Sequence, residues 1–411
     1  MLFLVAVQLV ATSAISNKAI VDILKSCFIL YTQINAFILK KVSIIYFNKK
    51  NINNPNFNKK IIIAPLDWGL GHATRCIPII NEFLAQQFQV YIAAEGAVGY
   101  LLQNEFPNLT HIPLQGYRVK YSQKGKYFAY KILWQIPGIV RRIIAENRWL
   151  HKVINQYGIT HVLSDNRYGL YNKSVHSIFL THQLYILTGY TFLNKIVQQI
   201  NYFFIEKYNQ CWVIDFAEAH NLAGLLSHPT RLPKVPVTYL SALSRFTIQP
   251  TLVQVNLLVV LSGPEPQRTI LEKIILPQLT ASIGSVVLVR GLPNHANQLS
   301  SPLPNVSIIN YLPAAELNQV VMQAKVVISR SGYTSIMDYA GLQKKVVYIP
   351  TPGQTEQNYL AQYIAQNNYG LMANQHNFNL NNALQNINNS NFTPYPSLSN
   401  TCLKQAIAQL V

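Results

Sequence analysis

One local pattern recurs along most of this chain: a short apolar run, then a turn of small or polar residues, then a stretch with helical apolar spacing. Short apolar runs bounded by turn residues are typical of buried strands. When the strand–turn–helix unit repeats, it indicates a parallel sheet with helices on both faces. The pattern therefore predicts a doubly wound α/β fold.

The pattern runs twice, interrupted by a polar segment at 241–251 that contains Pro250. Two such series predict two Rossmann-like domains with a cleft between their sheets, and ligands of these folds bind outside the carboxyl ends of the strands. The expected strands of the first series are 59–65, 90–94, 160–163, 177–180 and 211–214. Those of the second are 255–261, 285–289, 306–309, 326–329 and 346–349.

We expect four parts in the chain. Residues 1–58 form an apolar and basic N-terminal extension, which is a loosely structured segment outside the fold, a surface anchor or a poor signal sequence. Residues 59–245 form an N-terminal Rossmann-like domain, and 246–380 a C-terminal one. Residues 381–411 form a tail with a short helix at 402–410, and the ten Asn between 374 and 400 favour a loop there.

The chain is strongly basic, and its charge is unevenly placed. Lys and Arg number 33 against 15 Asp and Glu, a net charge of +18, of which residues 1–60 carry +7 and 116–152 carry +8. Basic residues alternate with aromatic ones in 116–152, which suits an anionic membrane surface. An ordinary helix pair with solvated charges and a nucleic-acid surface are the alternatives. No nucleic-acid motif accompanies the stretch, so we expect peripheral membrane contact and no nucleic-acid partner.

The composition excludes several classes of protein and site. Half of the residues are hydrophobic, too many for a disordered chain, yet no apolar run reaches the ~20 residues repeated in polytopic membrane proteins. The four cysteines are widely spaced, which disfavours a disulfide framework or a structural zinc site and fits a reducing compartment. No two aspartates form a D-x-D metal clamp.

Candidate catalytic residues follow strands of the first series. The segment 66–75 reads Leu-Asp-Trp-Gly-Leu-Gly-His-Ala-Thr-Arg, where two glycines permit close backbone approach and His72 can act as a general base. Asp165, Arg167 and His182 follow later strands, and either assist acceptor binding or replace His72 as the base.

Three loops of the second series offer groups for a nucleotide sugar. Residues 261–270 supply a hydroxyl, backbone N–H groups and a guanidinium for a diphosphate. Residues 328–338 supply hydroxyls and a carboxylate for ribose, and 348–357 supply amides and a carboxylate for sugar hydroxyls. Each loop alone is weak evidence for a nucleotide-binding cleft. The three together are stronger evidence, because each follows the carboxyl end of a strand.

The motifs at 69–72, 329–332 and 352–357 resemble those of the bacterial family 28 glycosyltransferases with the GT-B fold, the family of the lipid-II-forming UDP-N-acetylglucosamine transferase of peptidoglycan synthesis. The resemblance covers roughly residues 61–370. It implies that the domain at 59–245 binds the acceptor and the domain at 246–380 binds the nucleotide sugar. It implies an inverting, metal-independent hexosyltransferase that moves a sugar from a nucleoside diphosphate sugar, with UDP-sugar expected, to a hydroxyl of a lipid-linked or glycolipid acceptor. It implies no cofactor, because the nucleotide sugar is a substrate.

The loops and the resemblance together give a set of expected site residues. In the position of the family's ribose-binding Glu this chain has Asp338, and residues 263–266 read Gly-Pro-Glu-Pro where the family has a run of glycines. The expected catalytic residues are His72 and Asp165, and the acceptor-binding ones are Gly69, Gly71, Arg75, Arg167 and His182. The expected donor-binding residues are Ser262, Gly263, Arg268, Ser329, Arg330, Ser331, Gly332, Tyr333, Thr334, Asp338, Gln354, Glu356 and Gln357.

Two other functions remain open on the same sequence. One is epimerisation or hydrolysis of a nucleotide sugar on the same fold, and the other is a non-catalytic, membrane-associated nucleotide-binding protein. For the transferase we expect a cytoplasmic protein that lies peripherally on the inner face of the cytoplasmic membrane.

Overall fold

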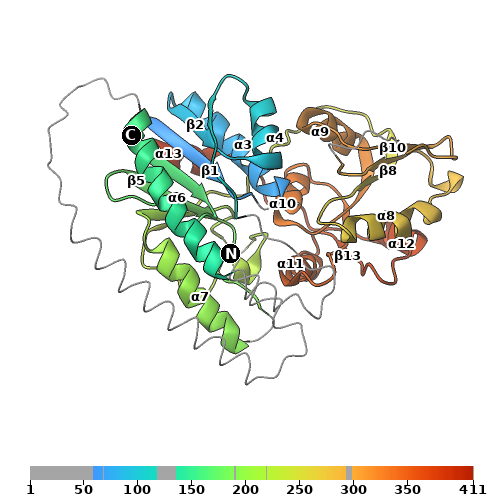
Figure 1. The fold of residues 1–411 in the computed structure, drawn as a ribbon. Coiled ribbons are helices and arrows are strands. Elements are labelled where there is room, and N and C mark those ends of the chain that lie inside the picture. The colour runs from blue at the N-terminus through green and yellow to red at the C-terminus, as the bar shows by residue number, and fades with distance from the viewer. Residues whose placement is uncertain are drawn as a thin grey trace.

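The computed structural model describes residues 59–67, 69–117, 136–188, 191–218, 220–292 and 299–410, which form two parallel sheets flanked by helices (Figure 1). The predicted fold class, two doubly wound Rossmann-like domains, is thereby confirmed. The extension 1–58 and residues 118–135 of the basic stretch lie outside the described residues. Within the described ranges, no helix combines the length and the apolar character that crossing a membrane requires.

The first sheet has seven parallel strands in the order β3-β2-β1-β4-β5-β6-β7. We call it and its helices the N-terminal unit. Its strands are β1 (Lys60–Pro65), β2 (Gln89–Ala93), β3 (Thr110–Ile112), β4 (His161–Asp165), β5 (His176–Thr181), β6 (Gln210–Val213) and β7 (Val237–Tyr239). Its helices are α3 (Leu70–Ala85), α4 (Gly96–Glu105), α6 (Ile136–Tyr157) and α7 (Thr191–Ile205).

The second sheet has six parallel strands in the order β10-β9-β8-β11-β12-β13, and we call it and its helices the C-terminal unit. Its strands are β8 (Val255–Val260), β9 (Val286–Val289), β10 (Val306–Ile309), β11 (Ala324–Ser329), β12 (Val346–Tyr348) and β13 (Leu371–Met372). Its helices are α8 (Gln267–Ile275), α9 (Ala314–Gln323), α10 (Tyr333–Gly341), α11 (Thr355–Gln366), α12 (Leu380–Asn389) and α13 (Thr401–Ala408).

The apolar strands are buried on both faces because alternate side chains point to opposite sides of a sheet. In β1, Ile61 and Ile63 belong to the core that includes α3, whereas Ile62 belongs to the core under α6. The second sheet is arranged in the same way, with α8 and α12 covering one face. Since the strand order of each sheet reverses between its first and fourth strands, the loops after these strands open onto the switch point where ligands bind.

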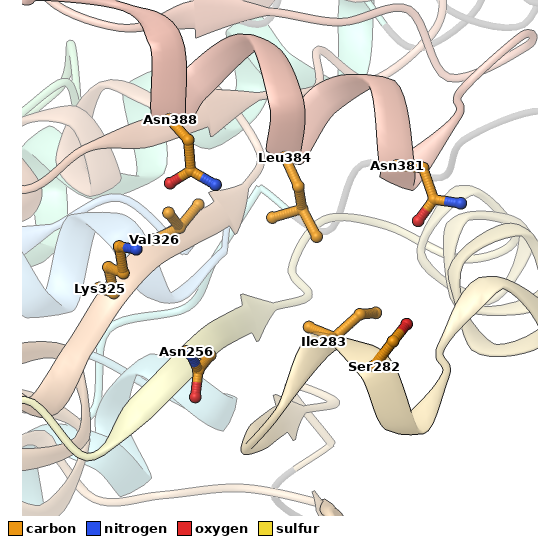
Figure 2. Close-up of a pocket in the computed structure, with 8 residues that line it drawn as sticks. All are labelled: Asn256, Ser282, Ile283, Lys325, Val326, Asn381, Leu384 and Asn388. Atoms are coloured by element: carbon orange, nitrogen blue, oxygen red, sulfur yellow. The ribbon is translucent and has the colours of Figure 1, made fainter.

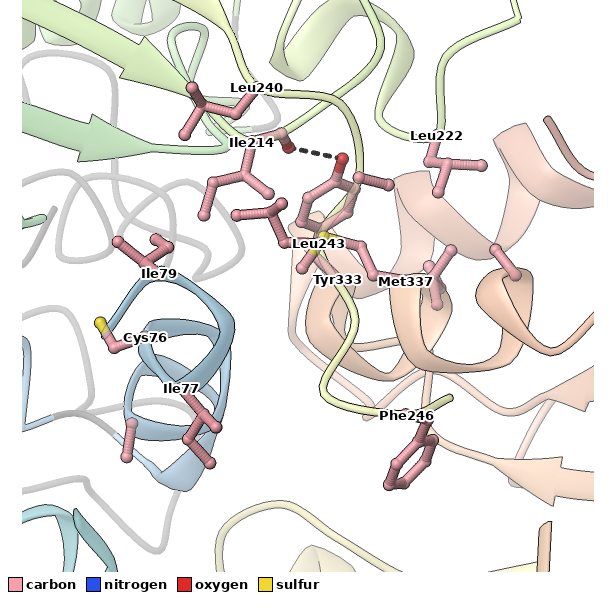
Figure 3. Packing of buried hydrophobic residues seen from close by; sticks show 14 of the residues in the cluster. Cys76, Ile77, Ile79, Ile214, Leu222, Leu240, Leu243, Phe246, Tyr333 and Met337 are labelled. Atoms are coloured by element: carbon pink, nitrogen blue, oxygen red, sulfur yellow. Dashed lines mark hydrogen bonds between the residues drawn. The ribbon is translucent and has the colours of Figure 1, made fainter. Parts of the chain in front are cut away.

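The two units share one apolar core. The largest cluster continues from the α3 face of the first sheet through α10 to the α9 and α11 face of the second. Figure 3 shows Tyr333 and Met337 of α10 with Ile77 and Ile79 of α3, which all belong to this cluster. The chain also returns to the N-terminal unit at its end, because α13 packs against α3, where Gln86 Nε2 donates to a backbone carbonyl of α13 at 3.1 Å.

Each expected strand has a counterpart in the structure, with ends that differ by at most two residues. The sequence pattern does not predict the strands β3, β7 and β13, because each is two or three residues long and lies at a sheet edge. The expectation of a loop over 374–400 is wrong, since α12 lies within it. Leu380, Ala383 and Ile387 supply a buried apolar stripe despite the many Asn residues, and Asn379 caps the helix by accepting from the backbone N–H of Asn382.

Candidate functional site

The candidate site lies where the carboxyl ends of the two sheets meet. Helix α10 packs against α3, and polar contacts join the beginning of α10 to the beginning of α3 and to the loop after β6. Thr334 Oγ1 donates to the Gly71 carbonyl at 3.3 Å, and the Tyr333 hydroxyl donates to the Ile214 carbonyl at 2.7 Å (Figure 3). The loops of the two units that were expected to bind acceptor and donor therefore lie directly against each other.

Two glycines allow the loop after β1 to make this contact. Gly69 has φ +83°, in the left-handed region that favours glycine. Gly71 is helical, but a Cβ at this position would lie 3.1 Å from Thr334 Oγ1. The backbone conformation at Gly69 and the close approach of Thr334 at Gly71 thus explain why both positions hold glycine. Their contact with an acceptor stays a prediction.

Three buried side chains form the centre of the site. His72 and Arg75 lie in the first turns of α3, and Asp165 lies at the end of β4; they are 6%, 2% and 0% exposed. Arg75 Nε donates to Asp165 Oδ2 at 3.0 Å, and Arg75 Nη2 donates to Oδ1. His72 Nδ1 lies 2.9 Å from the same Oδ2. Because bidentate arginine–carboxylate pairs are strong and directional, Arg75 and Asp165 fix the position of the imidazole.

The charges of this cluster follow from burial and from the pairing. Burial acts to raise the pKa of Asp165, but Arg75 and His72 outweigh it and lower this pKa to about 2. Burial, together with Arg75, lowers the pKa of His72 below its usual value of 6.5, although Asp165 acts in the opposite direction. At neutral pH the cluster therefore holds a carboxylate, a guanidinium and a neutral imidazole.

The tautomer of His72 decides what the ring can do. If Nδ1–H donates to Asp165, Nε2 carries a lone pair and can accept a proton, as a general base must. Arg75 Nη2 lies 2.7 Å from the same Nδ1, so the opposite tautomer, with Nδ1 as acceptor, also fits these positions. The cluster can thus hold His72 in the tautomer that acts as a base or, with one proton moved, in the tautomer that cannot.

His182, at the end of β5, connects this cluster to the C-terminal unit. Arg75 Nη1 lies 2.7 Å from His182 Nδ1, and His182 Nε2 lies 2.9 Å from Oε1 of Glu356 in the first turn of α11. The catalytic and acceptor-side residues predicted at 72, 75, 165 and 182 are therefore brought together, and Glu356 of the predicted donor site lies beside them.

The predicted donor side consists of the loops after β8, β11 and β12. Helices α8, α10 and α11 begin after these loops, and the N-cap residue of each makes no side-chain capping hydrogen bond. In α8, however, Glu265 Oε2 accepts from the first-turn N–H of Thr269 at 3.2 Å. The first-turn N–H groups of α10 and α11 are not taken by side-chain caps and can bind an anion such as a diphosphate. In the loop after β8, Ser262 is half-buried and Gly263 has φ +100°, and a Cβ on Gly263 would lie 3.6 Å from Thr351 Oγ1.

The side chain of Arg330 connects these loops by hydrogen bonds. Its side chain is 1% exposed, and it donates to the carbonyls of Gln267, Ile349 and Pro350 and to Gln375 Oε1 at 2.6–3.2 Å. Burial lowers the pKa of Arg330 to about 10, so it remains a cation at neutral pH. None of the carboxylates in the described ranges forms an ion pair with it, so the guanidinium has no direct counter-ion there.

Three other predicted site residues are engaged within the framework. Arg268 donates to Glu265, just before α8, and to Glu272 within α8. Arg167 donates to Glu146 of α6 and to the backbone carbonyl of Gln115. Asp338 accepts from Ser244 Oγ at 3.0 Å and from Arg245 Nε at 3.2 Å, both in the segment that links the units. These contacts give each of the three residues a role in holding the fold together. Their contacts with donor or acceptor stay predictions.

The remaining predicted donor residues line the same loops. Ser331 Oγ donates to the Gln357 carbonyl at 2.7 Å, while Gln357 Oε1 accepts from the Thr351 N–H at 2.9 Å. Gln354 accepts from Gln357 Nε2 at 2.6 Å, so the two amides brace the turn before α11. The hydroxyl of Ser329 accepts from Tyr339, and Gly332 is the N-cap of α10.

Sequence reasoning missed three polar groups near the site. Thr351 Oγ1, Asn166 Nδ2 and Gln183 Nε2 are buried without a hydrogen-bond partner among the described residues. Burying an unpaired polar group costs about 1–3 kcal/mol, so such groups are typically completed by a ligand or water. Asn166 and Gln183 adjoin Asp165 and His182, and this adjacency is the signal that could have found them.

The described residues hold no group of three His, Cys, Asp or Glu side chains arranged for a metal ion. A surface hollow of about 240 Å³ lies at the opposite end of the second sheet, where β8 and β11 begin (Figure 2). Polar side chains of Asn256, Lys325, Asn381 and Asn388 line it. Since ligands of these folds bind at the carboxyl ends of strands, this hollow lies away from the candidate site.

Comparison with known proteins agrees with this geometry. Residues 258–410 match the family model described as the glycosyltransferase family 28 C-terminal domain, which spans the donor loops from β8 onward. A search of curated proteins gave no match.

Solved structures resemble the chain over almost its whole described length. The glycosyltransferase of kitacinnamycin is 14% identical with a TM-score of 0.59, over 86% of this chain and 94% of that one. The calicheamicin glycosyltransferase CalG4 is 12% identical (TM-score 0.56; 86% and 93% covered). The spinosyn rhamnosyltransferase SpnG, solved with thymidine diphosphate, is 13% identical (TM-score 0.54; 85% and 95% covered). The chain therefore has the GT-B fold, and its C-terminal unit matches the glycosyltransferase family 28 C-terminal domain.

Proposed function

We propose that this protein is a glycosyltransferase that moves a hexosyl group from a nucleoside diphosphate sugar, a UDP-sugar in the first instance, to an acceptor hydroxyl. The observation that carries the proposal is the place of the His72–Asp165 pair. This pair belongs to the N-terminal unit, yet two side chains, Arg75 and His182, connect it by hydrogen bonds to Glu356 in the first turn of α11. A base placed beside a sugar-binding loop is what transfer to a hydroxyl requires.

In the proposed step, His72 is the base. With Nδ1–H donated to Asp165, His72 Nε2 takes the proton of the acceptor hydroxyl while that oxygen attacks the anomeric carbon. The bond from the anomeric carbon to the diphosphate breaks, and its electron pair leaves with the diphosphate. Asp165, ionised and fixed by Arg75, stabilises the imidazolium that forms. A single displacement of this kind inverts the anomeric configuration.

The C-terminal unit stabilises the leaving diphosphate. The uncapped N-termini of α10 and α11 offer N–H groups, and the buried cation of Arg330 adds positive potential near them. The unpaired hydroxyl of Thr351 adds a donor next to Gly263. These groups support a transfer that needs no metal ion to neutralise the leaving group.

We further propose that the acceptor is a lipid-linked sugar or glycolipid, reached from the inner face of the cytoplasmic membrane. The support comes from α6, the described end of the basic stretch. Arg141, Arg148 and Lys152 are exposed and share one face of this helix, whereas Leu150 and Val153 on the other face belong to the core. A basic face of this kind is attracted to anionic headgroups by ~1 kcal/mol per residue.

Two measurements test the proposal. Purified protein with UDP-sugars and extracted bacterial lipids should release UDP, and the product should carry the inverted anomeric configuration by NMR. Sugar released or epimerised at the same rate without an acceptor would instead indicate a hydrolase or an epimerase. Binding to anionic vesicles should weaken with salt and in Arg141→Glu/Arg148→Glu, and salt-insensitive binding would contradict the membrane part.

A further inference from the structure

His182 belongs to the N-terminal unit, but two of its three contacts are with the C-terminal unit. Its ring stacks on Tyr333 of α10, with centroids 4.7 Å apart and planes 9° from parallel. Its Nε2 lies 2.9 Å from Glu356 Oε1, and Arg75 Nη1 lies 2.7 Å from its Nδ1. The ring is buried, so these contacts hold its orientation.

These contacts determine where the proton of His182 lies. A guanidinium can only donate, so Nδ1 accepts from Arg75 and the ring proton is on Nε2. Nε2–H then donates to Glu356. The hydrogen bonds run in one direction, from Arg75 through His182 to Glu356, and Asp165 holds the guanidinium at their start.

The result is an ionised carboxylate held in one orientation at the boundary between the units. Although burial opposes it, His182 and then Arg75 lower the pKa of Glu356 below its usual value. His182 occupies Oε1, and no described residue pairs with Oε2, while the side chain is 23% exposed. A carboxylate oxygen left open in this way accepts hydrogen bonds from sugar hydroxyls.

We propose that His182 is a positioning residue for the donor sugar: it acts through Glu356, although it belongs to the unit expected to bind the acceptor. This inference rests on the proposed function. It means that the sugar part of the donor site is completed only when the two units are in contact, whereas the diphosphate part lies wholly in the C-terminal unit. His182 should therefore affect binding of a nucleotide sugar and not binding of the free nucleotide.

The experiment compares each nucleotide with its sugar derivative by calorimetry. UDP is paired with UDP-glucose and UDP-N-acetylglucosamine, and dTDP with dTDP-glucose; the pair that the wild type binds is used for the variants. In His182→Ala the Kd of the nucleotide sugar should rise about tenfold, the loss expected for one charge-assisted hydrogen bond, and that of the nucleotide should stay within about twofold. His182→Gln, which retains an N–H donor, should lie between the two.

Two controls separate positioning from structural damage. His220→Ala also removes a histidine that bridges the units, through its 3.4 Å contact with the Tyr369 hydroxyl, but lies away from Glu356 and should change neither Kd. In a Glu356→Ala background, His182→Ala should add little, because the group through which it acts is gone.

Three results would overturn the inference. If His182→Ala weakens the binding of the nucleotide and of the nucleotide sugar equally, the role of His182 is structural. If neither Kd changes, or the sugar binds more tightly, the contact with Glu356 does not orient the donor. If the wild type binds no nucleotide of either series, the proposed function fails and this inference with it, so the two failures are distinct.

Discussion

At the scale of single residues, the site depends on keeping one imidazole neutral. Burial and Arg75 lower the pKa of His72, so the base form dominates throughout the neutral range. We expect kcat/KM to stay level from pH 8 to about 6.5 and to fall only below that value, as His72 takes up a proton. An acid limb centred above pH 6.5 would show that another group is the base.

His72→Gln tests the same residue by mutation. Glutamine has a similar length and can still contact Asp165, but it cannot take up a proton. We expect kcat to fall by about 100- to 10,000-fold while the Kd of the nucleotide and the melting temperature change little. Asp165→Asn is the poorer test, because it leaves Arg75 buried without its counter-charge, which costs about 3–5 kcal/mol of stability. Retention of more than a tenth of the activity in His72→Gln would contradict the assignment.

The sequence could place His72, Asp165 and His182 because each follows a buried strand, and parallel strands bring such residues to one edge. It could not show which of the nearby charged residues were already paired. The engagement of Arg167 depends on Glu146, which lies on a helix in another layer. Partners of this kind follow from tertiary packing and leave no local pattern.

At the scale of elements, the contact between α3 and α10 depends on Gly71. Alanine at this position would favour the helix by up to ~1 kcal/mol, but its Cβ would lie 3.1 Å from Thr334 Oγ1. We therefore expect Gly71→Ala to lower the melting temperature of the wild type, and to be neutral or stabilising in a Thr334→Ala background. Gly138→Ala in α6 is the matched control and should be stabilising in both, because no atom of the described residues lies within 4 Å of its Cβ. The same effect of Gly71→Ala in both backgrounds would contradict the argument.

The elements themselves could be predicted where burial dominates. The central strands are apolar runs because helices cover both faces of the sheet, and that pattern is local. The peripheral strands β3, β7 and β13 could not be predicted, because so few residues carry no period. For α12, the stripe of Leu380, Ala383 and Ile387 was present in the sequence, but the Asn residues around it obscured it.

At the scale of the whole molecule, two histidines at the amino-terminal edge of the first sheet make stability depend on pH. Burial, and then His176, lowers the pKa of His161 to about 4, and burial also lowers the pKa of His176. Between pH 6.5 and about 4 the unfolded chain takes up protons that the folded chain does not. The free energy of unfolding should therefore fall as the pH drops through this window. Urea midpoints measured from pH 7.5 to 5 should show a shallower slope in His161→Gln, and an unchanged slope would contradict this account.

The shared core makes a prediction about cooperativity. Because one apolar cluster extends through both units, and α13 of the second packs on α3 of the first, neither unit should unfold alone. All four tryptophans precede residue 213, and the two within the described ranges, Trp149 of α6 and Trp212 of β6, lie in the N-terminal unit. Tryptophan fluorescence therefore reports this unit, while far-UV circular dichroism reports both. The urea midpoints of the two signals should coincide.

Met337→Ala makes this test sharper. Met337 is fully buried in the shared core on α10, in the unit that has no tryptophan, and its truncation should cost about 2–5 kcal/mol. If the molecule unfolds as one body, the fluorescence midpoint must fall as far as the dichroism midpoint, although the change lies outside the unit that fluoresces. A fluorescence midpoint that stays at the wild-type value while the dichroism splits into two transitions would show that the units unfold separately. Donor and acceptor sites would then be joined by surface contacts alone, and the orientation of Glu356 by His182 could not rely on a continuous core.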